Sequence, residues 1–186
     1  DHLDFTSWDQ LWDDSLRNKI FLFDGAREVI GMGLNSIGHS LNTKDVDTLR
    51  QATDKLKTLA PNVKAIIGDE VTNLMVNNEA AVALTFSGQA ADMLWENEEL
   101  DFAVPVEGSN LWFDNMVIPK TSKNIEGAHK FINFMLDAEV SAQNADYVGY
   151  STPNTAAMEL LDEEVITDKR FYPNIEMRDR LEVYED

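Results

Sequence analysis

Trp112 and Asp114 lie two positions apart in a short apolar run, and together they could bind an organic cation. If residues 111–118 form a strand, as their pattern predicts, the two side chains point to the same face. An indole ring attracts an ammonium group by about 0.5–2 kcal/mol and covers the neighbouring methylenes. The carboxylate would accept the N–H bonds. The other interpretation is a core tryptophan followed by a turn aspartate, and the pattern alone leaves both open.

Other candidate ligand groups follow predicted strands or lie in a loop. Glu28 opens a predicted helix after a strand, so its carboxylate either faces the carboxyl edge of a sheet or only offsets the helix dipole. Phe86 could stack on a ligand, and Ser87 could bond to it or be a simple helix N-cap. Tyr150, in a Gly-Tyr-Ser-Thr-Pro-Asn run, either contacts a ligand or packs within its loop.

These residues must be positioned by alternating strand and helix patterns. Strands are predicted over 20–23, 63–67, 81–86, 102–106 and 111–118. Helices are predicted over 7–18, 26–37, 46–59 with Thr43 as N-cap, 70–77, 89–97 and 125–138. This alternation is typical of an α/β fold, a sandwich with a mostly parallel sheet flanked by helices. The glycines at 31, 33 and 38 lie within a helix pattern and predict close helix packing, not a dinucleotide site.

Composition excludes several classes of protein. Apolar residues make up 44% of the 186 residues, enough to bury a core. The net charge of −19 disfavours nucleic acid or an anionic membrane as partner, and it fits either a cationic ligand or simple solubility. The chain has no cysteine, no apolar run of about 18 residues, and no H-E-x-x-H or G-x-S-x-G motif. We therefore expect no metal and no cofactor.

Several stretches occur in the order seen in a family of transport proteins. Together they resemble the spermidine/putrescine-binding proteins of ABC importers; the matching residues are 7–12, 24–29, 85–89, 108–119, 126–136 and 148–154. The Trp-Phe-Asp run at 112–114 and the Gly-Tyr-x-Thr-Pro-Asn run are the more specific parts. The resemblance covers almost the whole chain. Because residue 1 is Asp and no signal peptide precedes it, we expect a carboxyl-terminal fragment of such a protein.

The resemblance implies a two-lobed periplasmic-binding-protein fold of type II that closes on a linear polyamine. Such a protein works on the periplasmic or extracellular face of the membrane, as a soluble protein, a lipoprotein or a permease fusion, and delivers its ligand to the permease of the importer. It is not an enzyme. Residues 1–111 would belong to the second lobe, residues 112–152 would return to the first lobe, and residues 153–186 would cross back.

The resemblance also implies roles for single residues. Trp112 would be a stacking wall for the methylene chain, and Asp114 and Glu28 would accept ammonium N–H bonds. Tyr150 would be a further aromatic contact. Phe86 would replace a tryptophan wall with a weaker π partner.

The sequence departs from the family's pattern in two ways that bear on binding. Gly25 stands where many relatives carry an aspartate, with Asp24 one position earlier. The family's first-lobe segment has no counterpart here, so the apolar helix face that it would pack against would be exposed. The residues of that helix face are Phe131, Ile132, Met135 and Leu136. We expect a dimer or a rearrangement of that segment. We also expect polyamine binding by this chain alone at ~mM instead of ~μM.

Two other functional classes compete with the transport protein. A glycoside hydrolase could use Asp114 and Glu28 as its paired carboxylates. An acidic protein-interaction domain could dock a basic partner through its surface charge. The class of ligand that raises the melting temperature distinguishes the three.

Overall fold

The computed structural model describes residues 3–185, and their contacts divide into two compact units. One unit runs up to Trp112 and resumes at Asn174, and we call it the sheet unit. The other, Phe113–Pro173, is the helical unit. The assignment of 1–111 and 153–186 to one lobe, and of 112–152 to the other, stays a prediction.

The sheet unit is built on a parallel sheet, as the alternating pattern predicts. Among the described residues its strand order is β2-β1-β3, with β1 (Ile20–Phe23) between β2 (Val63–Ile67) and β3 (Val82–Ala83). Ile20 pairs with residues of both neighbours, Val63 and Val82. The predictions of strands at 20–23 and 63–67 are confirmed, whereas β3 is shorter than the predicted 81–86.

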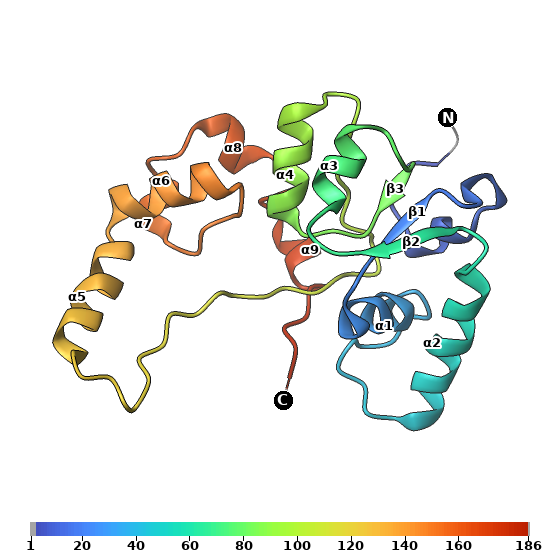
Figure 1. Cartoon of the computed structure of the whole chain (residues 1–186), viewed down its shortest axis with the longest axis horizontal. Coiled ribbons are helices and arrows are strands. Elements are labelled where there is room, and N and C mark those ends of the chain that lie inside the picture. Colours follow the sequence, from blue (N-terminus) through green and yellow to red (C-terminus); the bar gives the residue numbers. More distant parts are fainter. Residues whose placement is uncertain (1–2, 186) are drawn as a thin grey trace. The chain divides into compact units, whose positions relative to one another are not determined.

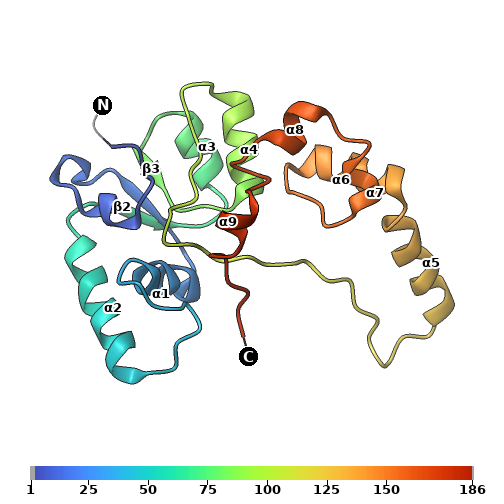
Figure 2. The same cartoon turned by 180° about the vertical axis from the view of Figure 1, so that it is seen from behind.

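Four helices cover the two faces of this sheet. Helices α1 (Ala26–Asn35) and α2 (Val46–Leu59) lie on one face, and α3 (Val71–Val76) and α4 (Ser87–Glu96) on the other (Figures 1 and 2). Alternation along β1 explains the two layers, because successive side chains of a strand point to opposite faces. Ile20 and Leu22 pack with residues of α1 and α2, while Phe21 packs with residues of α3 and α4.

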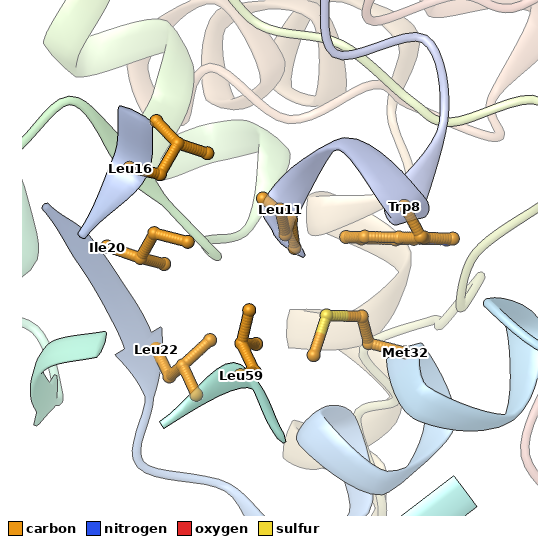
Figure 3. Close-up of a cluster of buried hydrophobic side chains, with 7 residues drawn as sticks. All are labelled: Trp8, Leu11, Leu16, Ile20, Leu22, Met32 and Leu59. Carbon is orange, nitrogen blue, oxygen red and sulfur yellow. The ribbon is translucent and has the colours of Figure 1, made fainter. Parts of the chain in front are cut away.

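The larger core cluster joins β1 to helices from distant parts of the chain. Met32 of α1 and Leu59 of α2 meet Ile20 and Leu22, and Trp8 and two leucines close the cluster from the amino-terminal side (Figure 3). Close helix packing is confirmed at Gly33, where a Cβ would lie 2.7 Å from the Leu56 Cδ1 atom of α2. It is wrong for Gly38, which follows the end of α1 with a positive φ and has no atom within 4 Å of a Cβ built there.

Two local predictions are wrong because side chains cap the backbone differently. The helix expected over 7–18 is two 3₁₀ helices, η1 (Trp8–Trp12) and η2 (Asp14–Leu16). Asp13 separates them, because its carboxylate accepts a bond from the Ser15 N–H and its backbone is extended. The N-cap of α2 is Asp45 instead of Thr43; its carboxylate accepts from the Thr48 N–H at 2.8 Å.

The strands predicted over 102–106 and 111–118 are also wrong. In the part of the chain that the structure describes, neither segment pairs with a neighbouring strand, and only Asn110 forms an isolated bridge, with Glu182. A segment with an alternating apolar pattern forms a strand only where another strand supplies its hydrogen bonds. Trp112 and Asp114 therefore do not share a strand face.

The helical unit contains α5 (Ile125–Met135), α6 (Ala138–Val148), α7 (Thr155–Met158) and α8 (Glu163–Thr167). Its buried side chains include Ala142 of α6 and Ala157 of α7, and α5 has none. Phe131 and Leu136 are each 59% exposed, and Ile132 and Met135 are half-buried. Helix α9 (Ile175–Arg178) belongs to the sheet unit. No helix within residues 3–185 is long and apolar enough to cross a membrane.

Candidate functional site

The carboxyl edge of the sheet brings together side chains that follow different strands. The chain leaves β1 at Phe23, passes Gly25 as N-cap and enters α1, which carries Glu28 in its first turn. It leaves β3 and enters α4 with Phe86 as N-cap. Because β1 and β3 are parallel neighbours, both turns lie at the same edge, where open α/β sheets bind ligands.

Three aromatic rings lie in contact at this edge. The ring centroids of Phe23 and Phe86 are 4.8 Å apart at an interplanar angle of 72°, and those of Phe86 and Trp112 are 5.7 Å apart at 78°. Both pairs are edge-to-face, the arrangement that aromatic quadrupoles favour. Trp112 is 36% exposed, so part of the indole still faces solvent. Phe23 was not among the predicted site residues.

A carboxylate lies beside the first of these rings. A Cβ built on Gly25 would be 2.2 Å from Glu28 Oε2 and 2.8 Å from the ring of Phe23. The Glu28 carboxylate therefore folds back over the Cα of Gly25 and next to Phe23, and it is half-buried there. We call Phe23, Phe86, Trp112 and Glu28 the edge cluster. A carboxylate beside aromatic faces is suited to an organic ammonium group.

Further charges at this edge favour a cation. The amino-terminal ends of α1, α3 and α4 would by themselves attract an anion. Acidic side chains offset that field, since Asp24 and Asp69 are both exposed at the edge. Asp69 accepts a bond from Gln89 Nε2 at 3.2 Å, and Gln89 in turn accepts from the Thr85 hydroxyl at 2.9 Å. Within residues 3–185, no group of acidic residues and histidines is placed to hold a metal.

Tyr184 is a residue that sequence reasoning missed. Its hydroxyl donates to the backbone carbonyl of Arg27 at 3.2 Å, and the Arg27 guanidinium lies 4.1 Å from the centroid of its ring. Burial raises the pKa of Tyr184 to about 12, helped by the negative Glu28 and opposed by Arg27. No local signal could have found it, because it contacts α1 from the far end of the chain.

The remaining predicted site residues have different surroundings. Ser87 is the first residue of α4, whose N-cap is Phe86 without a side-chain cap bond, so the N-cap interpretation of Ser87 is wrong. Asp114 lies in the helical unit and is exposed. Tyr150, also in that unit, is half-buried and follows Gly149, the left-handed C-cap of α6. The binding roles of all the predicted site residues stay predictions: Glu28, Phe86, Ser87, Trp112, Asp114 and Tyr150.

Comparison with known proteins identifies the family. The model of a family described as bacterial extracellular solute-binding protein matches residues 1–173. The spermidine/putrescine-binding periplasmic protein of Escherichia coli is 40% identical over 171 residues, which are 92% of this chain and 49% of that protein. The chain spans about half the length of the curated relatives it matches.

Solved structures agree with this assignment. The spermidine/putrescine ABC transporter substrate-binding protein PotD of Streptococcus pneumoniae is 56% identical, with a TM-score of 0.92 over 100% of this chain and 58% of its own. A protein of Listeria monocytogenes described as a spermidine/putrescine ABC transporter is 58% identical, with a TM-score of 0.91 over 99% of this chain and 57% of its own.

The chain belongs to the bacterial extracellular solute-binding proteins, as the sequence resemblance predicts. Its α/β fold is that of a periplasmic binding protein of type II. Membership of this family places it on the periplasmic or extracellular side of the cell membrane.

Proposed function

We propose that this chain supplies one side of a polyamine site in the solute-binding component of an ABC importer. The complete protein captures spermidine or putrescine and delivers it to the membrane permease. The observation that carries this proposal is the edge cluster, in which the Glu28 carboxylate lies beside Phe23, the first of three aromatic rings in successive contact at the carboxyl edge of the sheet. The names of the relatives favour the same ligand.

The chemistry of a linear polyamine matches the edge cluster. Its methylene segments bury apolar surface against Phe86 and Trp112, and each ammonium group is attracted by the ring faces. Glu28 accepts N–H bonds from one ammonium group, and Ser87 offers a hydroxyl beside Phe86. The proposal also keeps the predicted roles of Asp114 as an ammonium acceptor and of Tyr150 as an aromatic contact.

Binding is reversible, and release follows from opening of the two lobes without a covalent step. The relatives are transport proteins, which favours binding over glycoside hydrolysis by Glu28 and Asp114. The dimer expected from the uncovered face at 131–136 has no support from the names of the relatives, and the alternative, a rearrangement of that segment, stays a prediction.

A thermal denaturation panel tests the ligand class on this chain. With a Kd of ~1 mM, 10 mM spermidine would stabilise the folded chain by about 1.4 kcal/mol. For a chain of this size that raises the melting temperature by about 3–6 °C. A monoamine at the same ionic strength should have much less effect, because it reaches only one carboxylate. Equal shifts from both amines, or a shift only with an oligosaccharide, would contradict the proposal.

A further inference from the structure

The segment 181–185, which we call the strap, hydrogen-bonds to three separate parts of the sheet unit. The first is the segment directly before Trp112. The Leu111 N–H donates to the Glu182 carbonyl at 2.9 Å, and the Glu182 N–H donates to the Ser109 carbonyl at 3.0 Å. These two bonds fix the backbone on which the Trp112 indole is carried.

The second part is the turn that precedes α2. The Asn42 side chain donates from Nδ2 to the Val183 carbonyl at 2.8 Å, and its Oδ1 accepts from the Glu185 N–H at 2.9 Å. One amide group thus pairs with the strap as a neighbouring strand would. The Ser40 hydroxyl also donates to the Glu182 carboxylate.

The third part is the first turn of α1, which carries Glu28. Tyr184 bonds to the Arg27 carbonyl and lies against the Arg27 guanidinium, which also donates to the Glu185 carbonyl. The approach of the ring depends on Gly31, because a Cβ there would lie 3.1 Å from the Tyr184 hydroxyl. The strap therefore contacts the element that carries Glu28 and the segment that carries Trp112.

We propose that the strap positions Glu28 and Trp112 relative to each other, with Tyr184 and Asn42 as its positioning residues. The inference deepens the proposed function and rests on it. Glu28 and Trp112 belong to segments that do not pair with each other as strands, and strap residues 182–184 bond to the backbone of both segments. A flexible polyamine adds no rigidity of its own, so the protein must hold the carboxylate and the ring in place, and binding groups must be held to within about 0.5 Å.

The hydroxyl bond of Tyr184 persists over the physiological range. The phenol stays neutral and remains a donor, since its pKa is raised to about 12. Asn42 does not titrate, and its two bonds to backbone groups of the strap are equally independent of pH. We therefore expect the strap to hold the two segments in the same way at any pH in this range.

Two strap variants and two controls test the proposal in a protein of the relatives' full length that contains this chain. Tyr184→Phe removes one hydroxyl bond and keeps the ring against Arg27, whereas Asn42→Ala removes two bonds to the strap backbone and a longer one to the Glu182 carboxylate. Tyr147→Phe, at a tyrosine that is 88% exposed, controls for loss of a phenol. Leu16→Val, in the core beside the other end of β1, controls for lost stability.

We expect both strap variants to accelerate amide hydrogen exchange together at residues 26–31 and 109–112, while exchange in α3 stays unchanged. Spermidine affinity should fall about 3–10-fold in Tyr184→Phe and more in Asn42→Ala. Leu16→Val should lower the melting temperature and leave the affinity unchanged. Unchanged exchange, exchange that rises at only one of the two sites, or an affinity that follows the melting temperature in all variants would overturn the proposal.

The exchange measurement separates this proposal from the proposed function. If the unmodified protein does not bind spermidine or putrescine, the proposed function fails. The exchange at 26–31 and 109–112 needs no ligand and still decides whether the strap holds the two segments together.

Discussion

Replacing Glu28 by glutamine removes the carboxylate that the structure places beside Phe23 in the edge cluster. The side chain keeps its size, so Phe23 retains its neighbour and Gly25 stays covered. The substitution removes the negative charge and replaces one acceptor oxygen of the carboxylate by an amide group. The substitution therefore isolates the contribution of the carboxylate to polyamine binding.

The expected loss can be estimated from the surroundings of Glu28. Glu28 is half-buried as a residue and its carboxylate lies beside Phe23, so we expect an ammonium group bonded to it to be partly removed from water. A hydrogen bond to a charged group contributes about 1.5–3 kcal/mol, and each 1.4 kcal/mol corresponds to about tenfold in affinity. Spermidine affinity should thus fall about 10–100-fold. Loss of the favourable helix-dipole interaction costs about 0.3–1 kcal/mol of stability.

Calorimetric titration of a protein of the relatives' full length that contains this chain measures the affinity, and thermal denaturation measures the stability. Glu139→Gln is the matched control, because Glu139 is an exposed acid in the first turn of α6, an α-helix of similar length. Its stability should fall by a similar amount, with no change in affinity. If Glu28→Gln binds spermidine as tightly as the unmodified protein, Glu28 is not an acceptor and the edge cluster is not the site.

Three further predictions follow from the same geometry. Gly25→Ala should weaken spermidine binding, because the new methyl group displaces the Glu28 carboxylate. The extended backbone of residue 25 tolerates a side chain, so the fold should be kept. An unchanged calorimetric affinity would contradict this prediction. Trp112→Leu should weaken binding about 3–30-fold through loss of ~0.5–2 kcal/mol of cation–π attraction, and an equal affinity for spermidine would refute it. The raised pKa of Tyr184 favours its neutral form, so its contribution to stability is complete below pH 10 and is lost as the pH rises towards about 12. Urea denaturation should show this decline in the unmodified chain and not in Tyr184→Phe.

The elements with a strong local pattern could be predicted from sequence. The strands at 20–23 and 63–67 are apolar and lie between helix patterns, and the helix at 46–59 has a clear apolar face, so local residues decide their structure. The segment 111–118 shows the limit of this reasoning. Its pattern is that of a strand, yet in the described part of the chain it finds no partner strand. Strand formation depends on residues elsewhere in the chain.

The site was predictable only in part, for a related reason. Glu28 and Phe86 could be placed at the carboxyl edge because each follows a strand of a parallel sheet. The contact of Phe86 with Trp112 and the contact of Tyr184 with Arg27 join segments far apart in sequence. Such contacts depend on tertiary packing, which no spacing rule within one segment describes.

Titration of spermidine by calorimetry at low salt tests the central claim most directly. The protein of the relatives' full length and this chain alone would each be measured, with and without Glu28→Gln. We predict saturable heat at ~μM spermidine for the full-length protein and at ~mM for the chain. Both should weaken in Glu28→Gln, and both should weaken as salt screens the charges. A full-length protein that gives no saturable heat with spermidine or putrescine would contradict the claim that this chain forms part of a polyamine site.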